Sequence, residues 1–401
     1  MTRKEFIKYC KAIGIGLPVF LTLESCTDDE VSVAAPEFEV NFSGKVIIIG
    51  AGAAGLTAGY LLQRENIDFQ ILEASSVYGG RLKRADNFAD FPIDLGAEWI
   101  HTEPSILAEI LTNPNIQTDI DFITYNPQTI SVWKNGKLKK NNWASNFYSE
   151  YKFKSTTWYG FFENYIVPDI SDKIILNQPV TEIDYSTDMV NIKTNDGSVF
   201  EADKVLVTVP VKTLQDEYMD FIPSLPTEKI SAINSIKMGD GLKAFIEFRE
   251  RFYPDILNFG GLLTGNESDE KIFYDAAFRK DSDKNVLGLF TIGKPAGVYA
   301  ALDTEQQIID TIIGELDEIF NGKASENYVQ HVVQNWSKEP FIGGSYSTEF
   351  ENSRTGTMNT ISEPLDNKIY FAGEALSDEN QATVHGASET AYSTVEILLK
   401  N

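Results

Sequence analysis

Three glycines stand at the spacing of a phosphate-binding turn. Gly50, Gly52 and Gly55 follow the β-branched run 45–49 and precede a helical stretch at 56–63. The first glycine permits a tight turn, the second lets backbone amides approach a pyrophosphate, and the third lets the helix pack closely on the strand. The helix N-terminus adds N–H groups and the positive end of its dipole. The pattern predicts a dinucleotide site.

An acidic residue follows where a dinucleotide-binding unit needs one. Glu73 ends the next expected strand, 69–72, and lies 18 residues after Gly55. A carboxylate there can accept both hydroxyls of a ribose. The same charge would repel a 2′-phosphate, so these residues disfavour NADP and leave both FAD and NAD open.

The composition limits the class of protein. The chain has 401 residues, 42% of them hydrophobic, which is enough for two domains or one large domain with a core. Asp and Glu number 59 against 34 Lys and Arg, and the net charge of −25 excludes a uniformly basic nucleic-acid-binding surface. The two cysteines and three histidines exclude a disulfide framework and a Cys/His zinc cluster. We therefore expect no nucleic acid partner and no metal.

The first residues are typical of an export signal. A basic segment at 1–11 precedes the apolar run 12–23 and the sequence Leu-Glu-Ser-Cys, which ends at Cys26 and resembles a bacterial lipobox. We expect a signal peptide over 1–25, a lipid anchor on Cys26 and a lipoprotein tether over 26–42. The protein would then be exported and held on the bacterial cell envelope, with plain secretory cleavage as the alternative. The export route, general secretory or twin-arginine, stays open.

Four further segments identify the dinucleotide. Gly-Gly-Arg occupies 79–81, Asp-Leu-Gly-Ala-Glu-Trp-Ile-His occupies 94–101, and Ile-Tyr-Phe-Ala-Gly-Glu and Ala-Thr-Val-His-Gly-Ala occupy 369–374 and 382–387. In this order the motifs resemble those of the flavin-containing amine oxidase family, which includes monoamine and polyamine oxidases, histone lysine demethylases and L-amino-acid oxidases. The resemblance covers nearly everything after residue 44 and implies FAD.

The resemblance also implies the architecture. We expect an α/β fold with a Rossmann-like FAD-binding domain assembled from the separate segments 43–103, 176–215 and 336–401. An α+β substrate-binding domain, made of 104–175 and 216–335, would be inserted between them.

The family's cofactor contacts carry over to matching positions of this chain. They are Gly50, Gly52, Ala54 and Gly55 at the pyrophosphate, Glu73 at the ribose, Arg81 near the phosphates, and Val180 at the adenine. Around the flavin and its ribityl chain they are Gly96, Ala97, Glu98, Trp99, Trp336, Gly373, Glu374, Thr383 and Val384. We expect noncovalent FAD, because Ser345 stands where some relatives carry a flavin-bonding cysteine and no cysteine follows Cys26.

Two further residues are implied at the reaction centre. Lys243 lies in the alternating run 241–248, where a lysine would ordinarily face solvent. The resemblance makes it the catalytic lysine, which binds a water at flavin N5 and could stabilise negative charge on oxygen. Tyr346 would form one wall of the substrate cage and hold an amine by cation–π attraction. The second cage position matches Thr383 instead of an aromatic residue.

The implied activity is oxidation of a small-molecule amine to an imine, with oxygen reduced to hydrogen peroxide. An L-amino-acid oxidase or a tryptophan 2-monooxygenase is the first alternative. Those relatives typically place an arginine where Trp99 stands, which favours an amine. A noncatalytic surface flavoprotein is the second alternative. The sequence leaves the particular amine and the oligomeric state open.

Overall fold

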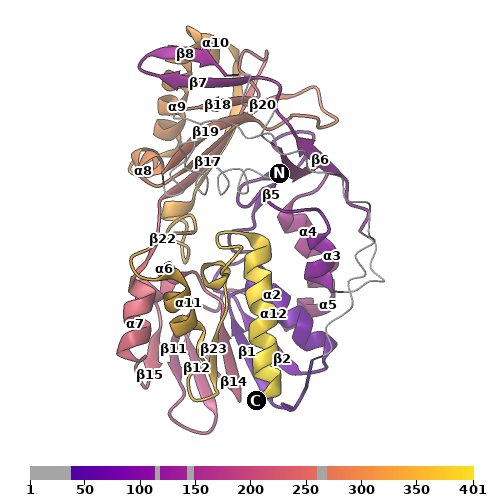
Figure 1. The fold of residues 1–401 in the computed structure, drawn as a ribbon, viewed down its shortest axis with the longest axis vertical. Helices are drawn as coiled ribbons and strands as arrows, with labels where there is room; N and C mark the ends of the chain where they lie inside the picture. The colour runs from indigo at the N-terminus through magenta and orange to yellow at the C-terminus, as the bar shows by residue number, and fades with distance from the viewer. Residues whose placement is uncertain (1–37, 113–117, 142–148, 260–268) are drawn as a thin grey trace, which may run out of the picture.

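The structure is a computed structural model that describes residues 38–112, 118–141, 149–259 and 269–401. The predicted signal peptide, Cys26 and most of the predicted tether lie outside these ranges. Two units make up the described chain, one with a parallel sheet and one with a large mixed sheet (Figure 1). Within the described ranges, no helix combines the length and the apolar character needed to cross a bilayer.

A five-stranded parallel sheet forms the lower unit of Figure 1. Its order is β10 (Ile174–Ile175), β2 (Asp68–Leu72), β1 (Lys45–Ile49), β14 (Lys204–Val207) and β23 (Ile369–Phe371). The central strand β1 is β-branched and buried on both faces, as parallel strands usually are. Val46 and Ile48 face one hydrophobic cluster, whereas Ile47 and Ile49 face another.

Helices from distant parts of the chain cover the face of the parallel sheet to which Val46 and Ile48 point. α2 (Ala53–Arg64) and α12 (Val384–Lys400) pack side by side, and the hydroxyls of Thr57 and Ser388 share a hydrogen bond of 3.0 Å (Figure 1). The same hydrophobic cluster takes in α3 (Ile106–Leu111), α4 (Trp158–Tyr165) and α5 (Val167–Ile170), which the 3₁₀ turn η2 (Ser171–Lys173) follows. These three helices fall in 104–175, so part of that predicted substrate segment packs on the parallel-sheet unit. The predicted domain boundaries stay a prediction.

A second, smaller sheet covers the other face. Its order is β13 (Val199–Ala202), β12 (Val190–Thr194), β11 (Val180–Asp184) and β15 (Asp220–Ile222). Beside it lie α6 (Val211–Gln215), α7 (Thr227–Asn234), α11 (Arg354–Ser362), the two-stranded sheet of β16 (Ile236–Met238) and β22 (Ser347–Phe350), and the 3₁₀ turn η4 (Glu374–Leu376). Val180 and Ile183 of β11 join Ile47 and Ile49 in this cluster.

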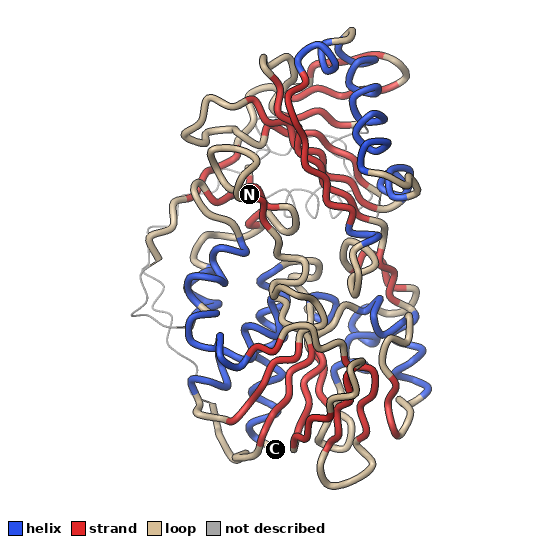
Figure 2. Tube along the Cα trace, turned by 180° about the vertical axis from the view of Figure 1, so that it is seen from behind, coloured by secondary structure: helices blue, strands red, loops and turns tan. Residues whose placement is uncertain are grey.

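The upper unit is a seven-stranded sheet with helices on one side (Figure 2). Its order is β21 (Tyr328–Asn335), β17 (Gly241–Phe248), β20 (Asn285–Ile292), β19 (Glu270–Asp275), β18 (Ile256–Asn258), β7 (Ile130–Lys134) and β8 (Lys137–Lys140). All its pairs are antiparallel except β18 with β7. The helices are α8 (Lys294–Ala300), α9 (Glu305–Phe320) and α10 (Lys323–Asn327). Exposed lysines fill the edge strand β8, a common protection against edge pairing.

Short elements join the two units and carry the motif 94–101. They are the pair β3 (Arg84–Ala85) and β4 (Ile93–Asp94), the sheet of β5 (Trp99–Ile100), β9 (Glu150–Phe153) and β6 (Phe122–Tyr125), and the 3₁₀ turn η3 (Trp336–Lys338). In β5 and β9, Trp99 stands opposite Lys152. The motif is therefore held between the parallel sheet and the seven-stranded sheet.

Strand β17 is buried along its whole length, including Lys243. Leu242, Ala244 and Ile246 pack in the cluster that includes α9, while Phe245 packs in a cluster on the opposite face. The ordinary expectation of a solvated lysine therefore fails at Lys243, because the elements around 94–101 cover that face.

Gly55 provides a test of the predicted turn packing. A Cβ on Gly55 would lie 1.9 Å from the carbonyl oxygen of Gly50, so Gly55→Ala should destabilise the fold by about 1–3 kcal/mol or more. Gly314 in α9 has nothing within 4 Å of the same position, so Gly314→Ala should stabilise by about 0.5–1 kcal/mol. Urea unfolding measures both changes. Equal stability of the two variants would contradict the packing role.

Candidate active site

A cavity of about 1060 Å³ runs between the two units. It is lined by nearly all the residues that the sequence singled out, namely Gly50, Gly52, Ala54, Glu73, Arg81, Gly96, Ala97, Glu98, Trp99, Val180, Lys243, Trp336, Tyr346, Gly373, Glu374, Thr383 and Val384. Gly55 does not line it and packs against Gly50 instead. Cys26 lies outside the described residues. The fold thus brings the predicted residues of four separate segments into one space.

The glycine turn presents backbone to the cavity. Gly50 has a φ of +102°, which disfavours a side chain, and Gly52 begins α2 without any side-chain cap. A Cβ on Gly52 would meet only the carbonyl oxygen of Gly79, at 4.0 Å, so the approach to the helix N-terminus is open. The turn fits a pyrophosphate, which would bind the uncapped N–H groups.

Glu73 lies beside this turn with both carboxylate oxygens hydrogen-bonded to backbone. One oxygen accepts from the N–H of Ala51 at 2.7 Å and the other from the N–H of Ser75 at 2.9 Å. Each carboxylate oxygen has a second lone pair. The buried carboxylate is thus fixed in place and still able to accept hydroxyls from a ribose.

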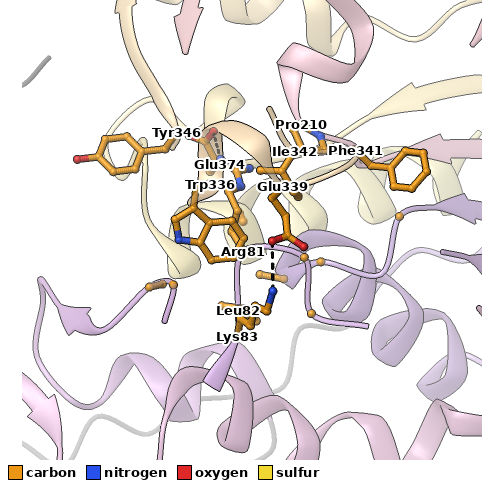
Figure 3. A pocket seen from close by; sticks show the side chains of 18 of the residues that line it. Arg81, Leu82, Lys83, Pro210, Trp336, Glu339, Phe341, Ile342, Tyr346 and Glu374 are labelled. Atoms are coloured by element: carbon orange, nitrogen blue, oxygen red, sulfur yellow. Dashed lines mark hydrogen bonds and ion pairs between the residues drawn. The ribbon is translucent and has the colours of Figure 1, made fainter. Parts of the chain in front are cut away.

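Arg81 is held by Glu374 across the cavity. Its Nη1 donates to Oε1 of Glu374 at 2.9 Å and to the carbonyl of Ser345 at 3.1 Å. Glu374 also accepts from the hydroxyl of Ser347 at 2.6 Å. Figure 3 shows Arg81, Leu82 and Lys83 on one side of this region, with Trp336, Glu339, Phe341 and Ile342 opposite them. Lys83 donates to Glu339 at 3.2 Å and closes this side.

The N-terminus of α12 points into the cavity. The hydroxyl of Thr383 accepts from the N–H of Gly386 at 3.0 Å and donates to the carbonyl of Asn380 at 2.6 Å. Thr383 is thus an ordinary helix N-cap. Because α12 has 17 residues and Thr383 and Val384 line the cavity, the positive end of its dipole also faces that space.

Lys243 reaches the cavity from β17 with every hydrogen of its ammonium group donated. Its Nζ lies 2.7 Å from the carbonyl oxygen of Asp94, 3.1 Å from that of Gly96, and 2.6 Å from Oε2 of Glu98. Only 4% of the residue is exposed. The predicted contact with a water at the flavin stays a prediction, and it requires one of these hydrogens to be shared or released.

Glu98 is the centre of a buried polar cluster that the sequence did not predict. Besides Lys243, it contacts Nζ of Lys152 at 2.5 Å, and the hydroxyl of Tyr274 donates to it. Burial opposes ionisation, but the two lysines lower the pKa of Glu98 to about 2. Burial, aided by the charge of Glu98, raises the pKa of Asp94 to about 8. No local sequence pattern at 150–153 indicates a role for Lys152. The pairing of β9 with β5 brings it next to Glu98.

Beyond Lys243, the wall formed by the seven-stranded sheet is mostly apolar and has one acidic group. Ile272, Phe290 and Ile292 line it, together with Glu270. Nearby, Nδ1 of His101 lies 3.3 Å from Oε2 of Glu150, whose side chain is 1% exposed. These two residues also line the cavity and were not predicted.

Three arginines line the cavity in the described part of the chain, and each contacts a group away from this wall. Arg81 pairs with Glu374, and Arg84 binds Glu163. Arg354 donates to the backbone of Ser377 at 3.1 Å and to that of Asp378.

Comparison with known proteins gives a consistent result. The family model described as "Flavin containing amine oxidoreductase" matches residues 53–157 and 162–399. Human lysine-specific histone demethylase 2 is 25% identical over 85% of this chain and 52% of its own length. Maize polyamine oxidase 1 is 24% identical over 88% of this chain and 90% of its own length. The chain thus spans about half of the human demethylase.

Solved structures share the fold. Putrescine oxidase bound to putrescine superposes with a TM-score of 0.72 at 14% identity, covering 90% of this chain and 100% of that chain. Cyclohexylamine oxidase from Brevibacterium oxydans gives 0.73 at 15% identity, covering 90% and 99%. The predicted fold class is confirmed.

The raised pKa of Asp94 predicts a pH-dependent stability. The folded protein keeps a proton on Asp94 up to about pH 8, whereas the unfolded chain releases it near pH 4. Between these values the wild type should lose stability relative to Asp94→Asn, by up to about 1.4 kcal/mol per pH unit. Denaturant unfolding at pH 5, 6 and 7 measures the difference. Asp184→Asn, at a partly exposed position on β11, is the control, and a pH-independent difference for Asp94→Asn would refute the assignment.

Proposed function

Because the chain belongs to the flavin-containing amine oxidoreductase family, we propose that it oxidises a small-molecule amine to an imine and reduces oxygen to hydrogen peroxide. Membership of the family confirms the predicted FAD cofactor and the predicted enzyme class, an FAD-dependent amine oxidoreductase. When bound, FAD would supply the hydride acceptor for oxidation at the carbon next to the amine nitrogen and the electron donor for reduction of oxygen. Hydrolysis of the imine would then give an aldehyde or ketone.

The cavity fits noncovalent FAD. Gly50, Gly52 and Ala54 would hold the pyrophosphate, with Arg81 as a nearby cation, and Glu73 would accept the ribose hydroxyls. At the other end, the N-terminus of α12 would face the ring system and favour its negatively charged reduced form, by roughly 0.3–2 kcal/mol. The remaining predicted contacts are Gly96, Ala97, Glu98, Trp99, Val180, Trp336, Gly373 and Glu374, all of which line the cavity.

The charges that line the cavity beside the seven-stranded sheet favour an amine over an amino acid as the substrate. A buried substrate carboxylate needs a cation, and without one its burial costs several kcal/mol. In the described chain, each arginine that lines the cavity is engaged away from this wall, and Lys243 is engaged by Glu98. The cavity instead presents Glu270 on this wall and Glu150 from β9. A cationic or neutral amine suits it better than a carboxylate.

A second amino group on the substrate would suit these acidic residues. Glu150 is almost fully buried and already pairs with His101. A cationic group of the substrate that reached Glu150 would replace His101 as its partner. The maize relative is named as a polyamine oxidase, and one solved neighbour holds putrescine. We therefore include di- and polyamines in the proposed substrate class, with Tyr346 as an aromatic wall.

Lys243 would act as a fixed cation at the cavity. Its ammonium group is buried and held by three acceptors, so it needs little reorganisation when negative charge develops on oxygen. This makes Lys243 our candidate catalytic residue for reaction with oxygen.

We also propose that the mature protein is exported and anchored through acylated Cys26. Its membrane contact would then be the lipid alone. Incorporation of labelled palmitate into the wild type and not into Cys26→Ala, with release of the variant from the membrane fraction, is the expected result. Equal labelling of both would exclude Cys26 as the anchor.

Anaerobic mixing with candidate substrates tests the activity. We expect amines, and diamines above all, to bleach the flavin absorbance, and air to restore it with one peroxide per turnover. Bleaching by amino acids only would favour the L-amino-acid oxidase alternative, and an amide product would indicate a monooxygenase. A flavin that no amine or amino acid bleaches would support a noncatalytic flavoprotein.

Glu150→Gln tests the site for a second cationic group. We expect kcat/KM to fall about tenfold for a diamine, a change of about 1.4 kcal/mol, and to change little for a monoamine of similar length. Glu339→Gln is the matched control, because Glu339 also lines the cavity but pairs with Lys83. An equal loss for both substrates would contradict the recognition of a second amino group.

A further inference from the structure

A second buried lysine lies behind Glu98. Lys152, on β9, is 3% exposed and does not appear in the lining of the cavity. Its Nζ lies 4.8 Å from the ring centroid of Trp99, 5.3 Å from that of Tyr125 and 5.0 Å from that of Tyr274. The charge is thus enclosed by three aromatic rings and one carboxylate, a costly place for an ammonium group.

Glu98 divides its oxygens between the two lysines. Oε1 contacts Nζ of Lys152 at 2.5 Å, while Oε2 accepts from Lys243 at 2.6 Å and from the hydroxyl of Tyr274. The orientation of Lys243 therefore depends on the plane of this carboxylate. That plane is fixed from its far side by Lys152. With Glu98 ionised and both lysines charged, this trio carries one excess positive charge beside the cavity.

We propose that Lys152 is a positioning residue for Lys243: it fixes Glu98 from the far side and adds its charge to the field at the reaction site. The proposal rests on the proposed function for the role of Lys243. Lys152 does not line the cavity and would act through Glu98.

A purely structural ion pair is the alternative, and the same fold contains one for comparison. Lys271 of β19 is partly buried, with its Nζ 2.5 Å from Oε2 of Glu315 and 4.3 Å from the ring centroid of Phe259. Tyr299 donates to the same carboxylate at 2.6 Å. This cluster lacks a second lysine and does not line the cavity. Lys271→Met is therefore a matched control for Lys152→Met.

The ionisable groups around the two lysines determine the expected pH effect. Lys243 is faced by Glu98, Asp94 and Lys152, and burial lowers its pKa with a further contribution from Lys152. Around Lys152 stand Glu98, Lys280, Asp275, Tyr125 and Tyr274. Removing the like charge of Lys152 should raise the pKa of Lys243.

The experiment uses FAD-loaded protein reduced photochemically, without any amine. Reduction potentials are measured against a reference dye, and reoxidation by oxygen is followed across alkaline pH. A plot of the reoxidation rate constant against pH should show an alkaline limb, in which the rate falls as Lys243 loses its proton. For Lys152→Met we expect the midpoint of this limb to rise by about one pH unit. We also expect the two-electron equilibrium to shift about tenfold toward oxidised flavin, or about 30 mV. Lys152→Arg, which keeps the charge, and Lys271→Met should both retain the wild-type limb and potential.

A wild-type limb and potential in Lys152→Met would overturn the proposal, as would an equal shift in Lys271→Met. If Lys152→Met fails to fold, Lys152→Gln replaces it, because Gln keeps a donor for Glu98 while removing the charge; the same two shifts are expected. Since no amine enters the measurement, failure of this proposal is distinct from failure of the proposed amine oxidation.

Discussion

The carboxylate of Glu98 compensates buried positive charge that reaches it from two different sheets. Lys243 comes from the seven-stranded sheet and Lys152 from the three-stranded sheet, and Tyr274 adds its hydroxyl from β19. Loss of a partner from a buried pair generally costs about 3–5 kcal/mol, because it leaves an uncompensated charge. The same contacts hold the segment 94–101 against the wall of the cavity. The contacts that neutralise the buried charges therefore also determine the shape of the site.

Much of the parallel-sheet unit could be predicted from local sequence. The turn at Gly50–Gly55, the strand before it and the acid at Glu73 are close together in the chain, so their spacing alone determines a recognisable geometry. The start of α12 at Thr383 is also local, because a hydroxyl before a helical run is a cap. Gly55 packs against Gly50, as the spacing predicted, but it does not line the cavity where the resemblance had placed it at the pyrophosphate.

The substrate side could not be predicted in the same way. Lys152, Tyr274 and Glu150 lie in strands with no distinctive local pattern. Their roles depend on the pairing of β9 with β5 and on the place of β19 in the seven-stranded sheet, which no spacing in the sequence reveals. The resemblance to the amine oxidases pointed to Lys243, but not to the acceptors that surround it. Nonlocal contacts also explain why an alternating strand such as β17 is buried on both faces.

The order of strands in the parallel sheet has a consequence for biosynthesis. β14 pairs with β23, and α2 packs against α12, so the unit that begins near residue 45 needs residues 369–400 for completion. During translation, α2 must wait for its packing partner α12, which is made more than 300 residues later. The glycine turn can form early, whereas the helix N-terminus at the far end of the cavity arrives last. The cavity that fits FAD is therefore complete only after synthesis of α12.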